Sequence, residues 1–170
     1  SDCLKEQDLK IVERAREIGK AIIVVINKTD LLNREELYEL KKNISNEPAL
    51  NGLPCCFISA MENKGFRSLF DQIYRVLKNA NTNISTNKLN KILSQAKEAK
   101  SIPYKGKFKP KVRYIHQGGK NPHILTLHGN SLEKLEGSYQ RFLTNFFHKK
   151  LNLSGITIKL KFINSKNPYN

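Results

Sequence analysis

The chain has 170 residues, enough for one or two domains, and its apolar content of 39% is ordinary for a folded protein and argues against intrinsic disorder. Its formal net charge of +15 is unevenly placed, because residues 1–80 hold 13 basic and 12 acidic side chains whereas residues 81–170 hold 17 and 3. An imbalance of that size favours a polyanionic partner over a merely soluble basic face. The change near residue 80 predicts a boundary between two domains, residues 1–80 and 81–170.

The first domain alternates between helical and strand patterns. A helix is predicted from Glu6 to Ile18, and Ala21–Ile26 and Leu53–Ile58 are short apolar runs typical of strands buried on both faces of a parallel sheet. Asn33, with Glu36 three residues later, predicts the capped start of the helix between them. The last helix carries an apolar stripe that we expect in the core: Phe66, Leu69, Phe70, Ile73, Val76 and Leu77. Two strands with three helices predict the back half of a doubly wound α/β domain.

Each predicted strand is followed by a short polar motif, Asn27-Lys28-Thr29-Asp30 after the first and Ser59-Ala60 after the second. Asp30 can accept both donors of a guanine edge, the ring N1–H and the exocyclic amino group. Lys28 can lay its methylene stem on the base, and Asn27 can bridge the base and neighbouring backbone. The backbone N–H of Ala60 can approach the guanine carbonyl oxygen, and Ser59 can steady the loop or the Asp30 carboxylate. These residues predict a guanine pocket.

Taken alone, N-K-x-D is more often a surface turn than a binding site, so the guanine interpretation depends on the strand–motif–helix order around it. The phosphate half of such a site is missing from these 170 residues, which contain no G-x-x-x-x-G-K-[ST] loop and no D-x-x-G. Phosphoryl transfer depends on groups that position and neutralise the phosphates. We therefore expect no catalytic residue and no hydrolysis from the chain by itself, whose sequence suggests a truncation or proteolytic product of a longer polypeptide.

The second domain begins after a polar linker over residues 79–84. Ser85 or Thr86 predicts the cap of a helix that extends to about Ala99, with four inward side chains: Leu89, Ile92, Leu93 and Ala96. A basic loop over residues 101–110 leads to a strand, 111–117. Its alternation places Val112 and Tyr114 on one face, with His116 a candidate for the same face, and Lys111, Arg113 and Ile115 on the other.

A hairpin turn, 118–122, predicts a returning strand, 123–128. Ser131 predicts the cap of a long helix that ends near Leu151, with its inner face formed by Leu132, Leu135, Tyr139, Phe142, Leu143 and Phe146. A final strand alternates apolar and basic residues over Ile156–Ile163. The order helix, strand, strand, helix, strand predicts an α+β layer.

Basic residues gather in and around these strands, and as a group they are candidates for contact with RNA phosphates: Lys105, Lys107, Lys109, Lys111, Arg113, Lys159, Lys161 and Lys166. Each alone is more often a solvated surface charge. Tyr114 is more often a core or interface tyrosine than a base-stacking one, and the spacing of His116, His123 and His128 fits no familiar metal site.

The cysteine pattern and the hydropathy of the sequence indicate the cellular compartment of the protein. Cys55 and Cys56 are adjacent and Cys3 is distant, which fits neither a disulfide framework nor a four-ligand zinc site. The sequence shows no signal peptide and no apolar stretch of 18 residues. These features predict a reducing, cytoplasmic location with no metal and no membrane partner.

Four stretches of the sequence resemble the bacterial GTPase family Der, also called EngA: EQDLKIVERAREIGKAIIVVINKTD, ISTNKLNKIL, KVRYIHQ and KFINSKNPY. The resemblance implies a partial P-loop GTPase domain followed by a KH-like domain. It implies that Asn27, Lys28 and Asp30 contact the guanine of GTP or GDP, with Ser59 and Ala60 completing the pocket, and that Mg²⁺ binds only in the complete protein. It further implies a monomer that acts in biogenesis of the large (50S) ribosomal subunit and whose partners are that subunit's RNA and proteins and its own upstream G domains.

Two other functions stay open on the residues alone. One is a nucleotide-independent RNA-binding module, and the other is a protein-docking module with an acidic partner. The sequence has no G-x-x-G loop of the kind that clamps RNA in KH domains, and the corresponding position, within 137–145, is expected to be continuous helix. We therefore expect attachment through phosphates and not through sequence-specific contacts.

Overall fold

The computed structural model describes residues 4–104, 107 and 109–164, arranged in two compact units. Of the described residues, the first unit comprises 4–80 together with 153–157, and the second comprises those from 81 to 152 and 158–164. The 153–157 segment therefore packs with the first unit although it lies between two elements of the second. Among the described residues, no helix is long and apolar enough to cross a membrane.

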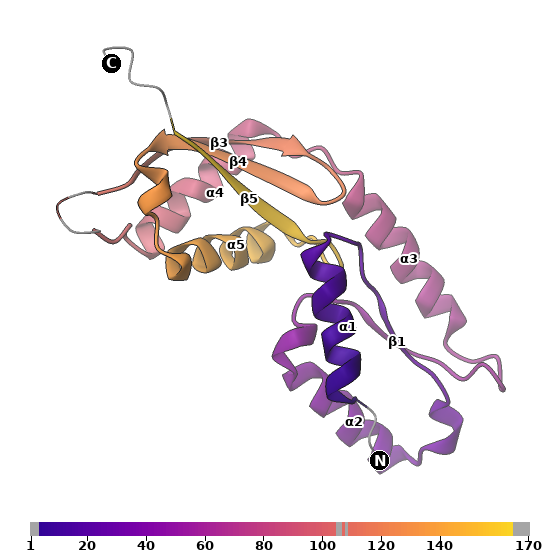
Figure 1. The fold of residues 1–170 in the computed structure, drawn as a ribbon. Helices are drawn as coiled ribbons and strands as arrows, with labels where there is room; N and C mark the ends of the chain where they lie inside the picture. Colours follow the sequence, from indigo (N-terminus) through magenta and orange to yellow (C-terminus); the bar gives the residue numbers. More distant parts are fainter. Residues whose placement is uncertain (1–3, 105–106, 108, 165–170) are drawn as a thin grey trace. The chain divides into compact units, whose positions relative to one another are not determined.

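The first unit contains three α-helices, two 3₁₀ helices and two strands within its described residues (Figure 1). In chain order they are α1 (Glu6–Glu17), β1 (Val24–Ile26), η1 (Thr29–Leu31), α2 (Arg34–Asn46), η2 (Pro48–Leu50), β2 (Cys55–Phe57) and α3 (Phe66–Ala80). The strands pair in parallel, with Val24 opposite Cys55 and Ile26 opposite Phe57. This parallel α/β arrangement is the predicted one, with strands shorter than their apolar runs.

The capped start of α2 is confirmed. The Asn33 Oδ1 atom accepts hydrogen bonds from the backbone N–H groups of Glu35 and Glu36, both at 2.9 Å. The Glu36 carboxylate in turn accepts from the Asn33 backbone N–H at 2.9 Å. This reciprocal pair satisfies donors that a helix N-terminus otherwise leaves unpaired.

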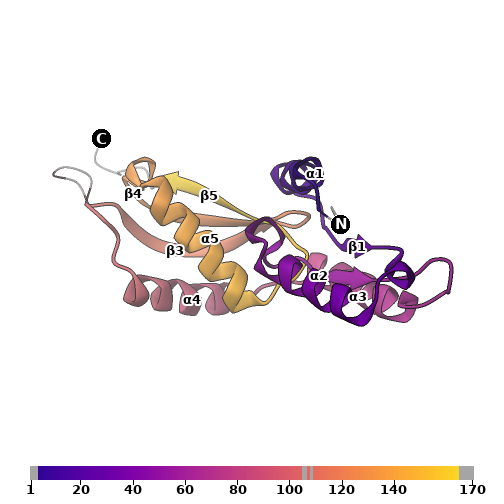
Figure 2. The same ribbon diagram turned by 90° about the horizontal axis from the view of Figure 1, so that it is seen from below.

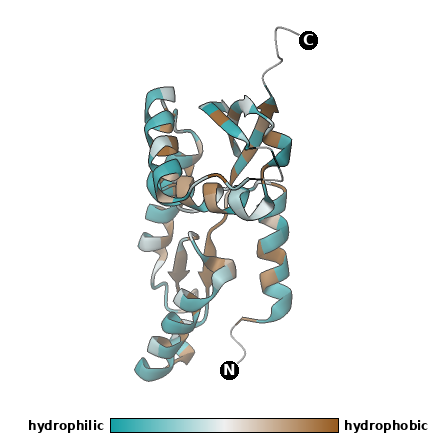
Figure 3. Cartoon of the chain, turned by 90° about the vertical axis from the view of Figure 1, so that its left-hand side faces the viewer, coloured by the Kyte–Doolittle hydropathy of each residue, from teal (hydrophilic) through white to brown (hydrophobic). Residues whose placement is uncertain are grey.

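The core of the first unit is small. Its buried cluster consists of Leu40, Ile44 and Leu50, with partly buried residues of α1, β1 and β2 packed around it. The expectation that the stripe along α3 lies in the core is only partly met: Val76 is buried, but Phe70 is 63% and Leu77 56% exposed. The described sheet has only two strands, so it cannot cover a whole helical face. Figure 3 shows that these strands are nonetheless hydrophobic.

The 153–157 segment is held by backbone hydrogen bonds at the start of both strands. The Gly155 carbonyl accepts from the Ile22 N–H, and the Gly155 N–H donates to the Gly52 carbonyl, each at 2.9 Å. The Asn79 side chain adds a bond of 3.2 Å to the Ser154 carbonyl. Gly155 has a φ of +76°, and a Cβ placed there would lie 2.7 Å from the Val76 Cγ2 atom. Only glycine fits this position without strain.

The second unit is an α+β layer, as predicted. Its elements are α4 (Thr86–Ala99), β3 (Lys111–Gly119), β4 (His123–Asn130), η3 (Leu132–Lys134), α5 (Gly137–Leu151) and β5 (Ile158–Asn164). The strand order is β3-β4-β5, with β3 and β4 antiparallel and β4 and β5 parallel. Helix α4 packs on β3 and on α5, and α5 packs on β5 (Figures 1 and 2).

The inner face of α4 is confirmed, since its four predicted residues are all buried: Leu89, Ile92, Leu93 and Ala96. The Ser85 hydroxyl caps this helix by accepting from the Lys88 N–H at 3.3 Å. The predicted start of the next helix is wrong. Ser131 has a φ of +55° and makes no capping bond, and a short 3₁₀ turn separates it from α5. As expected, α5 then continues unbroken from Gly137.

The predicted faces of β3 also need correction. A register shift between Val112 and Tyr114 breaks the alternation of the strand. Val112 and Ile115 are consequently both buried against the helices, whereas Tyr114 is 46% exposed. A bulge inserts one residue into one strand of a pair, so side chains beyond it change face. A period-two pattern cannot reveal where this happens.

Candidate functional site

The two predicted motifs lie together because the strands before them are parallel and in register. The Ile58 N–H extends the pairing by donating to the Ile26 carbonyl at 2.8 Å. Thr29 then bonds the Ile58 carbonyl twice, from its backbone N–H at 3.1 Å and from its hydroxyl at 2.9 Å. The chain after β1 is thereby fixed against the chain after β2, at the carboxyl ends of both strands, where α/β sheets usually bind ligands.

Asn27 joins the two loops through a single atom. Its Oδ1 accepts from the Lys28 backbone N–H at 2.7 Å and from the Ala60 backbone N–H at 3.0 Å. The Ala60 N–H, which is predicted to approach a guanine carbonyl, is thus bonded to Asn27 in this structure. Lys28 adopts the left-handed conformation, with φ +64° and ψ +35°, and its side chain is exposed. The sharp turn between strand and 3₁₀ helix occurs at Lys28.

Asp30 is the second residue of η1, and its carboxylate has an unused acceptor. The Oδ1 atom is buried and has no hydrogen-bond partner among the described residues. A buried acceptor without a partner is costly. A ligand that brings N–H donors to this carboxylate would remove the cost, and the guanine edge carries two such donors. The residues present therefore fit a guanine base.

The second loop is closed on itself around Ser59, which is buried. Ser59 and Lys64 exchange two backbone hydrogen bonds, of 3.1 and 3.0 Å. The Ser59 hydroxyl accepts from the Glu62 N–H at 3.1 Å, so this side chain steadies the loop. Gly65 completes the turn with a φ of +83°, and a Cβ there would lie 2.3 Å from the Phe57 carbonyl oxygen. The loop that carries Ala60 is accordingly well fixed.

Sequence reasoning missed two residues of this site. Thr29 supplies the hydroxyl that ties the loops together, and a hydroxyl inside the Asn27-Lys28-Thr29-Asp30 motif was the available signal. Lys64 forms an ion pair of 2.6 Å with Glu62. The pKa of Lys64 is raised, chiefly by its hydrogen bond to Glu62 and also by the charge of Asp30. No sequence pattern indicated that this lysine adds positive charge beside Asp30.

The predicted phosphate-contacting residues fall into two groups. Lys107 and Lys109 are exposed in the loop before β3, where the Lys109 ammonium lies 4.9 Å from the centre of the Tyr104 ring. Four others are in the sheet of the second unit and are exposed: Lys111 and Arg113 on β3, Lys159 and Lys161 on β5. Lys105 and Lys166 lie outside the described residues.

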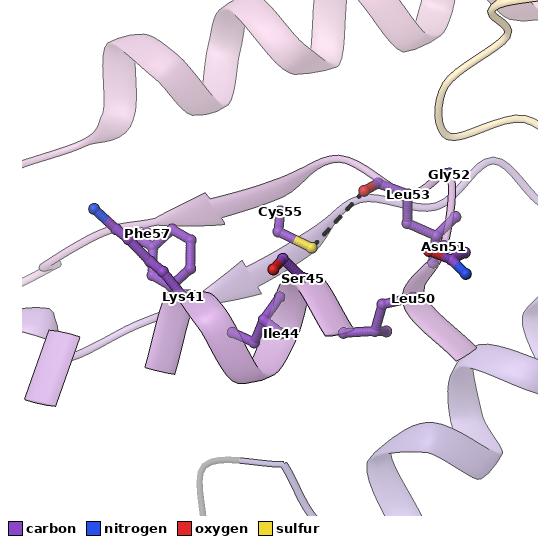
Figure 4. A pocket seen from close by; sticks show the side chains of 9 residues that line it. All are labelled: Lys41, Ile44, Ser45, Leu50, Asn51, Gly52, Leu53, Cys55 and Phe57. Atoms are coloured by element: carbon purple, nitrogen blue, oxygen red, sulfur yellow. Dashed lines mark hydrogen bonds between the residues drawn. The ribbon is translucent and has the colours of Figure 1, made fainter. Parts of the chain in front are cut away.

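A pocket of about 300 Å³ lies elsewhere in the first unit, between α2, η2 and β2 (Figure 4). Ile44, Leu50 and Cys55 line it, and the Lys41 ammonium lies 5.3 Å from the centre of the Phe57 ring at one end. Burial, and then the neighbouring Cys56, raise the pKa of the Cys55 thiol, which disfavours the reactive thiolate. The pocket contains none of the predicted guanine-binding residues.

Two protein families match the chain, one for each part. The elongation factor Tu GTP-binding domain matches residues 2–79, and the C-terminal KH-domain-like region of EngA bacterial GTPases matches residues 83–162. The two matches together cover most of the chain, with residues 80–82 between them.

Several individual relatives are named GTPase Der. The protein from Neisseria meningitidis is 36% identical over 167 residues, and that from Thiobacillus denitrificans is 38% identical over 169 residues; each covers 98% of this chain. The matched region is 34% of the first relative and 36% of the second. The chain thus spans about a third of the length of the curated relatives that it matches.

Proposed function

The chain belongs to the Der (EngA) family of GTPases, with part of a GTP-binding domain followed by the KH-like domain, and on that premise we propose that residues 1–80 recognise the guanine base of GTP and GDP. The observation that carries this proposal is the buried, unpartnered Oδ1 atom of Asp30, placed beside two loops that Asn27 locks together. Asp30 accepts the guanine N1–H and amino group, and Lys28 covers one face of the base.

This arrangement selects guanine because other bases would leave an acceptor of Asp30 without a hydrogen-bond donor. Adenine lacks the N1–H and the amino group at that edge, so it would leave the buried Oδ1 atom of Asp30 unsatisfied. A site built around a substrate hydrogen bond discriminates by a factor of roughly 10⁴ against an analogue that lacks it. Ala60 and Ser59 contribute by shape and loop rigidity, since the Ala60 N–H already bonds Asn27.

The role that we propose for these residues is recognition and not phosphoryl transfer. The 170 residues contain neither a phosphate loop nor a D-x-x-G motif, so the phosphates, their Mg²⁺ ion and the hydrolytic step would depend on residues of the complete protein. Phosphate contacts supply much of the affinity for a nucleotide. We therefore expect the chain alone to bind guanine nucleotides weakly.

The test is an exchange of base specificity in a polypeptide that also carries the phosphate-binding half. Asp30→Asn replaces a double acceptor by a side chain that also donates, which suits the second carbonyl of xanthine. The variant should bind GDP at least about 100-fold more weakly and should prefer xanthosine diphosphate. Asp71→Asn, at an exposed position on α3, is the matched control. Unchanged preference for GDP in Asp30→Asn would refute the assignment.

A second activity is proposed for residues 81–170, which carry 17 basic and 3 acidic side chains. We propose that they attach to ribosomal RNA phosphates during assembly of the large (50S) subunit in the cytoplasm. The exposed lysines and arginine of β3 and β5 support this proposal. Binding of the chain to isolated 50S subunits should weaken steeply with salt, because each neutralised phosphate releases counterions. A shallow salt dependence would instead favour docking on an acidic protein surface, either of a partner protein or of the G domains of the complete polypeptide.

A further inference from the structure

The sheet of the second unit has one face against its helices and one face without a helix. In Figure 1 helix α5 lies below the sheet and helix α4 passes behind it. The residues directed at the helices are buried: Val112, Ile115, Leu125, Leu127 and Ile158. The strand pairing places Tyr114 and His116 of β3 beside His128 and Thr126 of β4 on the opposite face. We call these four residues and the adjoining basic residues of β3 and β5 the open face.

Three rings on the open face form a nearly parallel cluster. The Tyr114 and His128 rings lie 4.5 Å apart between centres, with only 3° between their planes. The His116 and His128 rings lie 5.1 Å apart at 25°. Tyr114 is the most open of the three, and it is one of two large exposed hydrophobic side chains recorded in this unit. A flat aromatic surface is thus held in place and left partly uncovered.

The surroundings of His128 favour its neutral form. The His128 Nε2 atom is buried and has no hydrogen-bond partner among the described residues. Loss of solvent around His128, and then the charge of His116, lower the pKa of His128. A neutral ring presents a π face that can stack on another aromatic ring. Tyr114 and the neutral His128 ring therefore form a stacked pair on which a further ring can stack.

Positive charge surrounds the cluster. The three strands contain Lys111, Arg113, Lys159 and Lys161 and no aspartate or glutamate. Lys161 is in register with Thr126, and Thr126 is in register with His116. No described residue forms an ion pair with Lys111, Arg113 or Lys161. Side chains that can hold phosphates thus lie within a few residues of a surface that can hold bases.

We propose that the open face binds single-stranded RNA, with an unpaired base stacked on Tyr114 and neighbouring phosphates on Arg113 and Lys161. Proteins that bind single strands combine a basic surface with aromatic rings on which bases stack. A duplex keeps its base faces inside the stack, so it could use the charges but not the rings. An acidic peptide has the same limitation. The proposal rests on the RNA-facing role of residues 81–170 and adds the base contact to it.

The test uses the 170-residue chain and a fluorescently labelled, unstructured RNA about ten nucleotides long. Fluorescence anisotropy gives Kd over a series of salt concentrations. Tyr114→Leu should raise Kd about 5- to 150-fold, the range for loss of one stacked base, and should leave the salt slope unchanged. Tyr114→Phe keeps the ring and should bind like the wild type. Tyr38→Leu, which removes an exposed tyrosine of the first unit, is the matched control.

Substitutions of single lysines test whether the open face itself contacts RNA phosphates, as distinct from residues 81–170 in general. Lys161→Gln should weaken binding and reduce the magnitude of the salt slope by about 0.7, the value for one phosphate on a single strand. Lys91→Gln removes an equal charge from the exposed side of α4 and should change binding less. Upfield shifts of the Tyr114 ring protons in NMR spectra of the wild type with RNA would support stacking without any variant.

Three outcomes would overturn the base contact. If Tyr114→Leu bound RNA with the wild-type Kd while Lys161→Gln bound more weakly, the open face would contact RNA through phosphates alone. The proposed attachment of residues 81–170 to RNA phosphates would then stand without the base contact. Equal affinity for the single strand and a duplex of the same length would also exclude the stacked base. Loss of binding in both Tyr114→Leu and Tyr114→Phe, with unchanged Tyr114 ring shifts in the wild type, would likewise contradict it.

Discussion

At the scale of single residues, the guanine site depends on a few side chains that bond backbone groups of the opposite loop. Asn27 and Thr29 make these bonds to Ala60 and Ile58. The sequence could predict that the two motifs meet, because parallel neighbouring strands end at one edge of a sheet. It could not predict that the Ala60 N–H would bond Asn27, because that depends on the rotamer of one amide.

We predict that Asn27→Ala destabilises the first unit by about 1–2 kcal/mol, since it removes the acceptor of two backbone N–H groups. Chemical denaturation followed by circular dichroism would measure the change. Asn43→Ala, at an exposed position of α2, should change stability by less than about 0.5 kcal/mol. Equal effects of the two substitutions would mean that the Asn27 bridge contributes nothing specific.

We predict that His128 titrates below its ordinary pKa of 6.5, because it loses solvent and faces His116. His128 then binds a proton more readily in the unfolded protein than in the folded one. Its contribution to the free energy of unfolding is therefore present above pH 6.5 and falls as the pH drops towards the folded-state pKa. Proton NMR of the His128 C2–H signal, assigned with His128→Gln, measures the midpoint. A midpoint at or above that of a free histidine would contradict the ring cluster.

At the scale of elements, the long and strongly patterned segments were predictable. The capped starts of α2 and α4 and the buried face of α4 follow from local sequence. Two other features could not be predicted from local sequence. The bulge that turns Tyr114 outward leaves no mark in the alternation of β3, and the 3₁₀ turn after Ser131 replaces a helix start that a serine normally favours. The helix cap was lost because Ser131 takes a left-handed conformation.

The 153–157 segment supports a prediction at this scale. Gly155→Ala would place a methyl group 2.7 Å from Val76 and 2.9 Å from the Ile22 carbonyl oxygen, at a φ of +76°. We expect a loss of roughly 2 kcal/mol or more, from strain and from displaced packing. Thermal unfolding would measure it.

Gly137→Ala is the control, because a Cβ at the first position of α5 meets nothing within 4 Å. It should be neutral or should stabilise the protein by up to about 1 kcal/mol, since alanine favours a helix more than glycine. If Gly155→Ala were as well tolerated as Gly137→Ala, the segment would not hold the first unit as its hydrogen bonds indicate.

At the scale of the whole molecule, the two units differ in how well they bury apolar surface. Nine of the eleven exposed large hydrophobic side chains recorded among the described residues belong to residues 1–80. The sequence predicted apolar strands and an apolar α3, but it could not show how much of this surface the described chain leaves uncovered. Burial depends on partners in space, whereas periodicity depends only on local spacing.

This difference predicts unequal stability. Amide hydrogen exchange should be faster in β1 and β2 than in β3 and β4, because the first unit has few buried apolar contacts. Mass spectrometry of peptides from each strand would measure the exchange. Equal protection in the two sheets would show that the exposed apolar residues do not weaken the first unit.

The most direct test of guanine recognition is an NMR titration of the isotope-labelled chain with GDP, with ADP as the control. Weak binding is expected, so the nucleotides should reach about 10 mM, where a complex of roughly 3 kcal/mol is half formed. We predict that GDP shifts the amide signals of Asn27, Lys28, Asp30 and Ala60 and that ADP leaves them in place. Equal shifts with both nucleotides, or GDP-induced shifts confined to residues away from these two loops, would contradict the guanine site.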